Sequence, residues 1–195
     1  MNTLELFCGT KSFSKIAKDL GYNIFTIDNN PKHNPDICKN ILEIKKSDIP
    51  YKPDIIWASP PCTDYSHAKR KGVSHMELSN MYVIKTLNLI SVLNPKFWVL
   101  ENPQTGTLKF QYFMEDLPFS DVDYCMYGMP YRKRTRLWNN FNYVGNRCNH
   151  SGKHKDSCGN GTKKYTTQHY NNIEKGSIPK SLIYDLFEQV KQLED

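Results

Sequence analysis

The sequence lacks an apolar run long enough to cross a membrane, which takes roughly 20 residues. Its first residues, MNTLELFCG, also lack the basic and then apolar pattern of a secretory signal. We therefore expect a protein of the cytoplasm, in a prokaryotic or virus-infected cell. Disulfide bonds are rare in that compartment, so the six cysteines of the chain favour thiol or metal chemistry over a disulfide framework.

Acidic residues are fewer than basic ones, and the 195-residue chain carries a net charge of +6. This balance fits a polyanionic partner such as nucleic acid, although many basic proteins bind none. Hydrophobic residues make up 38% of the sequence, which excludes a disordered polyelectrolyte and is enough for one core.

Short apolar runs alternate with helical patterns in the first half of the chain. The predicted strands lie at 3–7, 23–28, 54–59 and 97–100, and the predicted helices at 12–20 and 75–93. This alternation predicts an α/β fold with a doubly wound sheet. Further strands are predicted at 122–127 and 137–141, and an amphipathic helix at 180–193.

The chain divides into three parts by composition. We expect an α/β domain over 1–141 and a helix at 177–195 that packs back on it. Residues 142–176 are rich in Gly, Asn, His, Lys and Cys, with almost no aliphatic residues. We expect this segment to be either a long ligand-contacting loop or a small metal-stapled insert.

The turn Phe7-Cys8-Gly9-Thr10-Lys11-Ser12 joins the first strand to the first helix, with Ser12 as a candidate N-cap. Backbone N–H groups at such a helix start suit a nucleotide-like ligand. A single glycine does not make the three-glycine dinucleotide fingerprint, so a plain linker is an alternative. Asp28 ends the second strand, where doubly wound folds place a carboxylate for ribose hydroxyls.

A cysteine and a glutamate follow two buried strands. The double proline Pro60-Pro61 ends one strand and delivers Cys62 into a loop, and a second apolar strand leads into Glu101-Asn102-Pro103. Open α/β sheets bind ligands at this carboxyl edge. Alone, such a cysteine is more often structural and such a glutamate is usually a solvated surface group, but together they form a coherent candidate site for nucleophilic chemistry.

The basic run Arg132-Lys133-Arg134-Thr135-Arg136 leads into another predicted strand. Alternation places Arg134 and Arg136 on one face of that strand. The pair is either part of a solvated basic surface or a clamp for a phosphate or a substrate carbonyl.

In this order, LFCGTKS, PPC, ENP and RTR resemble the motifs of the C5-cytosine methyltransferases. The segment SPPCTDYS and the ENP triplet are similar to the sequences of the compact bacteriophage or viral branch of this family. The resemblance implies a Rossmann-like fold and transfer of a methyl group from S-adenosylmethionine to a cytosine flipped out of DNA. It implies Cys62 as the covalent nucleophile, Glu101 as the partner of the base ring, and Arg134 or Arg136 as the group that holds the base carbonyl.

The resemblance also implies a set of cofactor contacts. Phe7, Thr10 and Ser12 would line the methionine and ribose part, and Asp28 and Asn29 the ribose and adenine. The family's Asp-Ile pair corresponds to Asn40-Ile41, with Asp36-Ile37 as the alternative alignment. Ser177 stands where the family carries a cofactor-contacting Asn. Two further residues belong to the same expected pocket, namely Pro61 and Met81.

The insert at 142–176 occupies the place of the family's target-recognition region and is much shorter. We expect it to contact double-stranded DNA through phosphates, with Lys153, Lys155, Lys163 and Lys164 as the binding residues. Cys148, His150 and Cys158 resemble an irregular zinc site, but the spacing fits no standard finger, and a plain basic loop is the alternative.

Three rival functions remain open at this stage. The same fold also serves RNA cytosine methyltransferases that act on transfer RNA. A nucleic-acid-binding protein without catalysis is disfavoured because Cys62, Glu101 and Arg136 are intact. A nicotinamide-dependent oxidoreductase is disfavoured by the missing glycines. We expect the protein to be a monomer.

Overall fold

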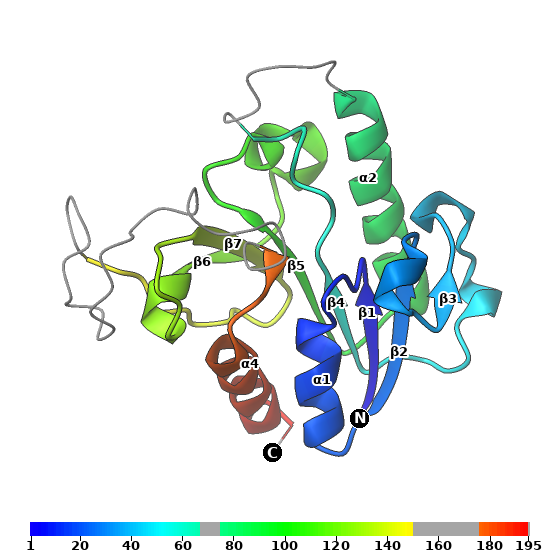
Figure 1. The fold of residues 1–195 in the computed structure, drawn as a ribbon, viewed down its shortest axis with the longest axis horizontal. Helices are drawn as coiled ribbons and strands as arrows, with labels where there is room; N and C mark the ends of the chain where they lie inside the picture. The colour runs from blue at the N-terminus through cyan, green and yellow to red at the C-terminus, as the bar shows by residue number, and fades with distance from the viewer. Residues whose placement is uncertain (67–74, 150–175, 195) are drawn as a thin grey trace.

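The computed structural model describes residues 1–66, 75–149 and 176–194. Figure 1 shows a seven-stranded sheet in the order β3-β2-β1-β4-β5-β7-β6. The strands are β1 (Asn2–Leu6), β2 (Asn23–Asp28), β3 (Ile37–Cys38), β4 (Ile55–Ala58), β5 (Phe97–Pro103), β6 (Phe119–Asp123) and β7 (Arg134–Asn139). The five strands β1 to β5 run parallel, whereas β7 is antiparallel to both of its neighbours, β5 and β6. The predicted doubly wound α/β fold is confirmed.

Helices cover both faces of the sheet. Helices α1 (Ser12–Asp19) and α4 (Lys180–Gln192) pack together on one face, and α2 (Met76–Leu93) lies on the other (Figure 1). Short 3₁₀ turns connect the elements, among them η2 (Ile41–Glu43) and η6 (Tyr124–Tyr127). None of the helices in the described ranges is long and apolar enough to span a membrane.

Alternating residues of the central strand β4 feed two cores. Trp57 packs with α1 and α4, whereas Ile56 packs with α2. Phe13 of α1 stacks on Trp57 and on Phe187 of α4, with ring centroids 5.5 and 5.2 Å apart. The continuous apolar run in β4 is thus explained by burial on both faces.

Helix α1 begins differently from the prediction. Ser12 is its first residue and not its cap, and Lys11 occupies the cap position in a left-handed conformation without a capping hydrogen bond from its side chain. The buried carboxylate of Glu5 accepts from the backbone N–H groups of Phe13 and Ser14 instead. The strand before the turn therefore supplies the acceptor that the helix start needs.

The region around β6 and β7 also departs from the prediction. The predicted strand 122–127 ends at Asp123, because the chain turns there into η6 and Tyr124 points inward to a buried position. Gly128, with φ of 85°, ends that turn. The following strand starts at Arg134, so the basic run lies partly inside β7 and not ahead of it.

Candidate active site

Cys62 follows β4 on a turn that β5 holds in place. The side-chain amide of Asn102 donates to the carbonyl of Pro60 at 3.0 Å, and Asn102 is fully buried. The backbone N–H of Ser59 donates to the carbonyl of Leu6 in β1. The double proline limits the remaining freedom of the turn, so Cys62 is presented at the carboxyl edge as predicted.

Glu101 is a buried carboxylate with two donors. The phenol of Tyr124 and the ammonium of Lys133 both donate to its Oε1, at 3.1 and 3.2 Å. Glu101 is 6% exposed, so these contacts are shielded from water. A buried charge next to a partner of opposite sign is the arrangement in which an ion pair acts most strongly.

The pKa of the Cys62 thiol depends on Glu101 and on its charged partner Lys133. Burial raises the pKa of Cys62, the negative charge of Glu101 raises it further, and the positive charge of Lys133 lowers it. The cysteine and the glutamate from neighbouring strands therefore lie within electrostatic reach of each other. Since the thiolate is the nucleophile, the charge balance at this point controls reactivity.

The two arginines of the predicted clamp lie elsewhere. Arg136 is in register with Asn102 and forms a two-pronged pair with Asp121, with Nε–Oδ1 at 2.8 Å and Nη2–Oδ2 at 3.0 Å. Its guanidinium also stacks 3.4 Å from the ring centroid of Phe119. Arg134 is about half exposed, with Nε 4.0 Å from Oδ1 of Asp123. Because neighbouring strand residues face opposite sides, both arginines lie on the face opposite to Glu101.

The turn after β1 is tightly folded. Three of its residues have positive φ, namely Phe7, Gly9 and Lys11. Gly9 donates its N–H to Oδ2 of Asp28 at 3.0 Å, while Oδ1 of Asp28 accepts from Asn30. The predicted ribose carboxylate is thus also the group that ties the turn to the end of β2.

A pocket opens beside this turn. It is lined by Phe7, Ile27, Asp28, Asn29, Lys39, Asn40, Ile41, Pro61 and Tyr82. Six of the predicted cofactor residues therefore line one cavity. Its walls combine apolar and aromatic side chains with a carboxylate and amides, as small-molecule sites usually do.

The remaining predicted cofactor residues fall outside that lining. Met81 is 52% exposed, and the adjacent Tyr82 lines the pocket in its place. Asp36 accepts from the backbone and side chain of Thr26, which favours the alignment through Asn40-Ile41 over that through Asp36-Ile37.

The hydroxyls of Thr10 and Ser12 lie 2.8 Å apart at the start of α1. The segment before α4 reaches this same place, because the N–H of Ile178 donates to Oγ of Ser12 at 3.3 Å. Ser177 is therefore next to a residue that contacts the turn, and its contact with the cofactor stays a prediction.

The expected zinc site has no support. Cys148 is buried, and its N–H donates to Oδ2 of Asp123 at 2.9 Å. Among the described residues, no group of three or more His, Cys, Asp or Glu side chains could hold a metal ion. His150 and Cys158 lie outside the described residues, as do Lys153, Lys155, Lys163 and Lys164.

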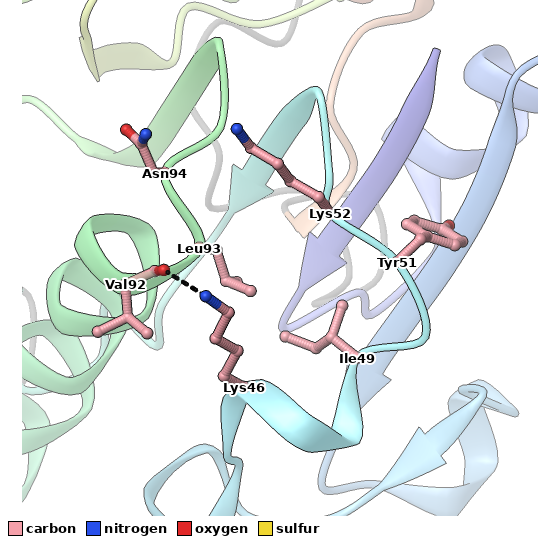
Figure 2. A pocket seen from close by; sticks show the side chains of 7 residues that line it. All are labelled: Lys46, Ile49, Tyr51, Lys52, Val92, Leu93 and Asn94. Carbon is pink, nitrogen blue, oxygen red and sulfur yellow. Dashed lines mark hydrogen bonds between the residues drawn. The ribbon is translucent and has the colours of Figure 1, made fainter.

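A second pocket lies at the opposite end of the sheet (Figure 2). Its lining residues precede β4 or end α2, so it opens away from Cys62: Lys46, Ile49, Tyr51, Lys52, Val92, Leu93 and Asn94. The ammonium of Lys46 donates to the carbonyl of Val92 across it. None of the residues singled out in the sequence lines this pocket.

Five residues at the site were missed in the sequence. Lys133 and Tyr124 contact Glu101, and the other three line the pocket, namely Ile27, Lys39 and Tyr82. Lys133 stands inside the basic run, on the opposite strand face from Arg134 and Arg136. The sequence pattern places Tyr124 in the predicted strand 122–127, and Tyr82 is the helical neighbour of the predicted Met81.

Comparison with known sequences identifies relatives of the chain. The family described as C-5 cytosine-specific DNA methylase matches residues 1–106. A protein of Frog virus 3 (isolate Goorha), named Probable DNA (cytosine-5)-methyltransferase, is 32% identical over 176 residues, covering 82% of this chain and 78% of its own. The type II methyltransferase M.HindV of Haemophilus influenzae is 27% identical over 141 residues, covering 64% of this chain and 44% of its own.

Two solved structures share the fold. A protein described as a putative DNA modification methyltransferase encoded within a prophage of E. coli has a TM-score of 0.55 at 17% identity, covering 71% of this chain and 46% of its own. The Dnmt2 methyltransferase of S. pombe has a TM-score of 0.53 at 18% identity, covering 75% and 52%. The chain therefore spans about half the length of these structures. From the family match and the viral relative together, the chain belongs to the C-5 cytosine-specific DNA methylase family.

Proposed function

We propose that this chain transfers a methyl group from S-adenosylmethionine to C5 of a cytosine in DNA, through a covalent adduct on Cys62. The observation that carries the proposal is the pairing of Cys62 and Glu101 at the ends of the adjacent strands β4 and β5, with Asn102 bonded to Pro60. Cys62 is thereby held rigidly next to a buried carboxylate, as nucleophilic catalysis on a polar ring requires.

The proposed chemistry explains why the site needs these two side chains. C5 of cytosine is a poor nucleophile, and a bond from the Cys62 sulfur to C6 places electron density on C5. Glu101 meets the ring at N3 and the exocyclic amine, and a proton shared between its carboxyl group and N3 offsets the negative charge that develops on the ring. When C5 has taken the methyl group, a base removes the C5 proton, the bond from sulfur to C6 breaks, and Cys62 leaves as thiolate.

The pocket beside the first turn fits the cofactor that the family implies. S-adenosylmethionine supplies the electrophilic methyl group. Both oxygens of Asp28 accept one backbone N–H, and each carboxylate oxygen has a further lone pair for a ribose hydroxyl. The apolar rings of Phe7 and Tyr82 and the side chain of Ile41 provide flat contact for adenine.

Double-stranded DNA is the proposed partner, with its target base flipped into the site. The insert at 142–176 stands between β7 and α4, and its lysines Lys153, Lys155, Lys163 and Lys164 are the proposed phosphate contacts. This part of the proposal rests on the sequence. We place the protein in the cytoplasm on the same basis.

Duplex DNA that contains 5-fluorocytosine tests the proposal. With S-adenosylmethionine present, the fluorine cannot leave as a proton does, so a covalent complex should accumulate and resist denaturation. Cys62→Ser should abolish the complex, and Cys38→Ser, the matched change at an exposed cysteine, should retain it. An adduct that persists in Cys62→Ser refutes the assignment of the nucleophile.

The nature of the substrate is tested separately. Labelled methyl groups should enter duplex DNA and not transfer RNA in parallel reactions. Preferential labelling of transfer RNA would leave the chemistry in place and replace DNA by RNA as the partner.

A further inference from the structure

A basic side chain with no assigned role lies beside Glu101. Lys133 immediately precedes β7, and its Nζ lies 3.2 Å from Oε1 of Glu101. The side chain is 15% exposed, and its ammonium also sits 4.8 Å from the ring centroid of Tyr124. Lys133 is thus held between a buried carboxylate and a buried aromatic ring.

The direction of β7 explains this placement. Because β7 is antiparallel to β5, its first residues lie beside the last residues of β5, at the edge where Cys62 and Glu101 stand. Along β7, Leu137 pairs with Glu101 and Thr135 with Pro103. Residues at odd positions therefore share the face of Glu101, and Lys133 continues that series.

The arginines of the same run are engaged elsewhere. Asp121 holds the guanidinium of Arg136 through two hydrogen bonds, and Arg134 lies nearest to Asp123. A two-pronged guanidinium pair that is mostly buried is costly to break. Among the described residues, the ammonium group that pairs with Glu101 is therefore that of Lys133.

We propose that Lys133 is a cation of this active site: it holds the carboxylate of Glu101 and stabilises the thiolate of Cys62. In this step the Cys62 S–H bond breaks, the proton goes to water, the sulfur keeps the electron pair, and Lys133 stays protonated. The catalytic meaning of this step rests on the proposed function, whereas the effect on the thiol belongs to the chain itself.

The charges around the thiol agree with this role. Among the described residues, Tyr124 from η6 and Lys133 from the start of β7 contact the carboxylate of Glu101 in β5. Burial and Glu101 raise the pKa of Cys62, and Lys133 opposes both. Removal of the ammonium would leave Glu101 as an uncompensated negative charge beside the sulfur.

The rate of alkylation by iodoacetamide at pH 8 tests the proposal without DNA or cofactor. Cys62 and Cys38 are followed as separate peptides by mass spectrometry, and exposed Cys38 serves as the reference within the same molecule. The variants are Lys133→Met, Lys133→Gln and Lys133→Arg. Arg134→Met is the matched control, because it removes a charge from the adjacent residue on the opposite face.

We expect the Cys62 rate, relative to Cys38, to fall roughly 3–10-fold in Lys133→Met and in Lys133→Gln, since a nearby opposite charge shifts a pKa by about one unit or more. Lys133→Arg should retain most of the rate, and Arg134→Met should equal the parent. If Lys133→Met does not fold, Lys133→Gln decides, because it keeps a donor to Glu101 and loses only the charge.

Two results would overturn the proposal. A parental rate in Lys133→Gln would mean that Lys133 acts through its hydrogen bond alone. An equal loss of the Cys62 alkylation rate in Arg134→Met would mean that removal of any nearby positive charge has the same effect. Neither result depends on methyl transfer. The proposed function instead depends on the 5-fluorocytosine adduct, so the two failures can be told apart.

Discussion

Asn102 joins the two catalytic strands, because its side chain belongs to β5 and its hydrogen bond belongs to the turn after β4. Its Nδ2 donates to Pro60, while its Oδ1 has no hydrogen-bond partner among the described residues. In Asn102→Leu, the lost hydrogen bond and the removal of an unsatisfied oxygen offset each other, so unfolding free energy should change by at most about 1 kcal/mol. Methyl transfer should fall about tenfold or more, because Cys62 loses its fixed position.

Urea unfolding and single-turnover transfer measure the two effects of Asn102→Leu. Asn139→Leu is the matched control, since Asn139 is also a buried asparagine but bonds to Leu137, Phe141 and Tyr143. It should destabilise the fold and leave the rate per folded molecule unchanged. Asn102 would be a purely structural residue if its variant showed the pattern of the control.

Glu101→Gln should separate chemistry from cofactor binding. Glu101 lies at the end of β5, whereas the cofactor pocket lies beside β1 and β2. Calorimetric affinity for S-adenosylmethionine should stay nearly unchanged, and single-turnover transfer should fall roughly 100-fold or more, as for loss of one preorganised contact. An unchanged rate would contradict the role given to this carboxylate.

At the scale of elements, β1 and α1 share a buried carboxylate. Burial raises the pKa of Glu5 to about 7, against the opposing effect of the N–H groups at the start of α1. The folded state therefore keeps a proton that the unfolded chain releases above pH 4.5. Folding stability should fall as pH rises from 4.5 to about 7, by roughly 3 kcal/mol from this group.

The variant Glu5→Gln isolates the contribution of Glu5 to the pH dependence of folding stability. The free energy of unfolding of the parent should decrease relative to that of the variant as pH rises through this interval, as measured by urea titrations at several pH values. A difference between the two proteins that does not vary with pH would mean that Glu5 has the same pKa in both states.

The insert at 142–176 should act as an electrostatic element. Changing Lys153, Lys155, Lys163 and Lys164 to Gln should lower the slope of log affinity against log salt by roughly 2–4, since each phosphate contact releases about one counterion. DNA-binding titrations over salt concentration measure this slope. A matched set on the exposed faces of α1 and α4, Lys15, Lys18, Lys180 and Lys191, should leave it unchanged. A parental slope in the insert variant would direct the search to Lys69-Arg70-Lys71.

At the scale of the whole molecule, the apolar face of α4 packs against α1 and completes the core on that side of the sheet. Phe187 is 1% exposed and stacks on Phe13, which in turn stacks on Trp57 of the central strand. Phe187→Ala should therefore lower the free energy of unfolding by roughly 3–5 kcal/mol, measured by urea titration. A loss below about 1 kcal/mol would show that α4 contributes little to the core.

Local pattern was enough to predict the central strands and the meeting of Cys62 with Glu101. Each central strand is a continuous apolar run, and parallel strands bring their last residues to one edge. The direction and register of β7 depend on partners distant in sequence. A shift of one residue exchanges the two faces of a strand, so the sequence alone does not show that Lys133, and not Arg134 or Arg136, shares the face of Glu101. Neighbouring helix positions differ by about 100°, which separates Tyr82 from Met81 in the same way.

The insert is attached to the catalytic unit at two defined points. On one side, Cys148 bonds to Asp123, whose carboxylate also pairs with Arg132 next to the active-site lysine. On the other side, Ile178 bonds to Ser12 at the start of α1. The attachments lie outside residues 150–175, so under the proposed function the intervening sequence can change, and with it the DNA target, while the contacts of the proposed methyl-transfer site are kept.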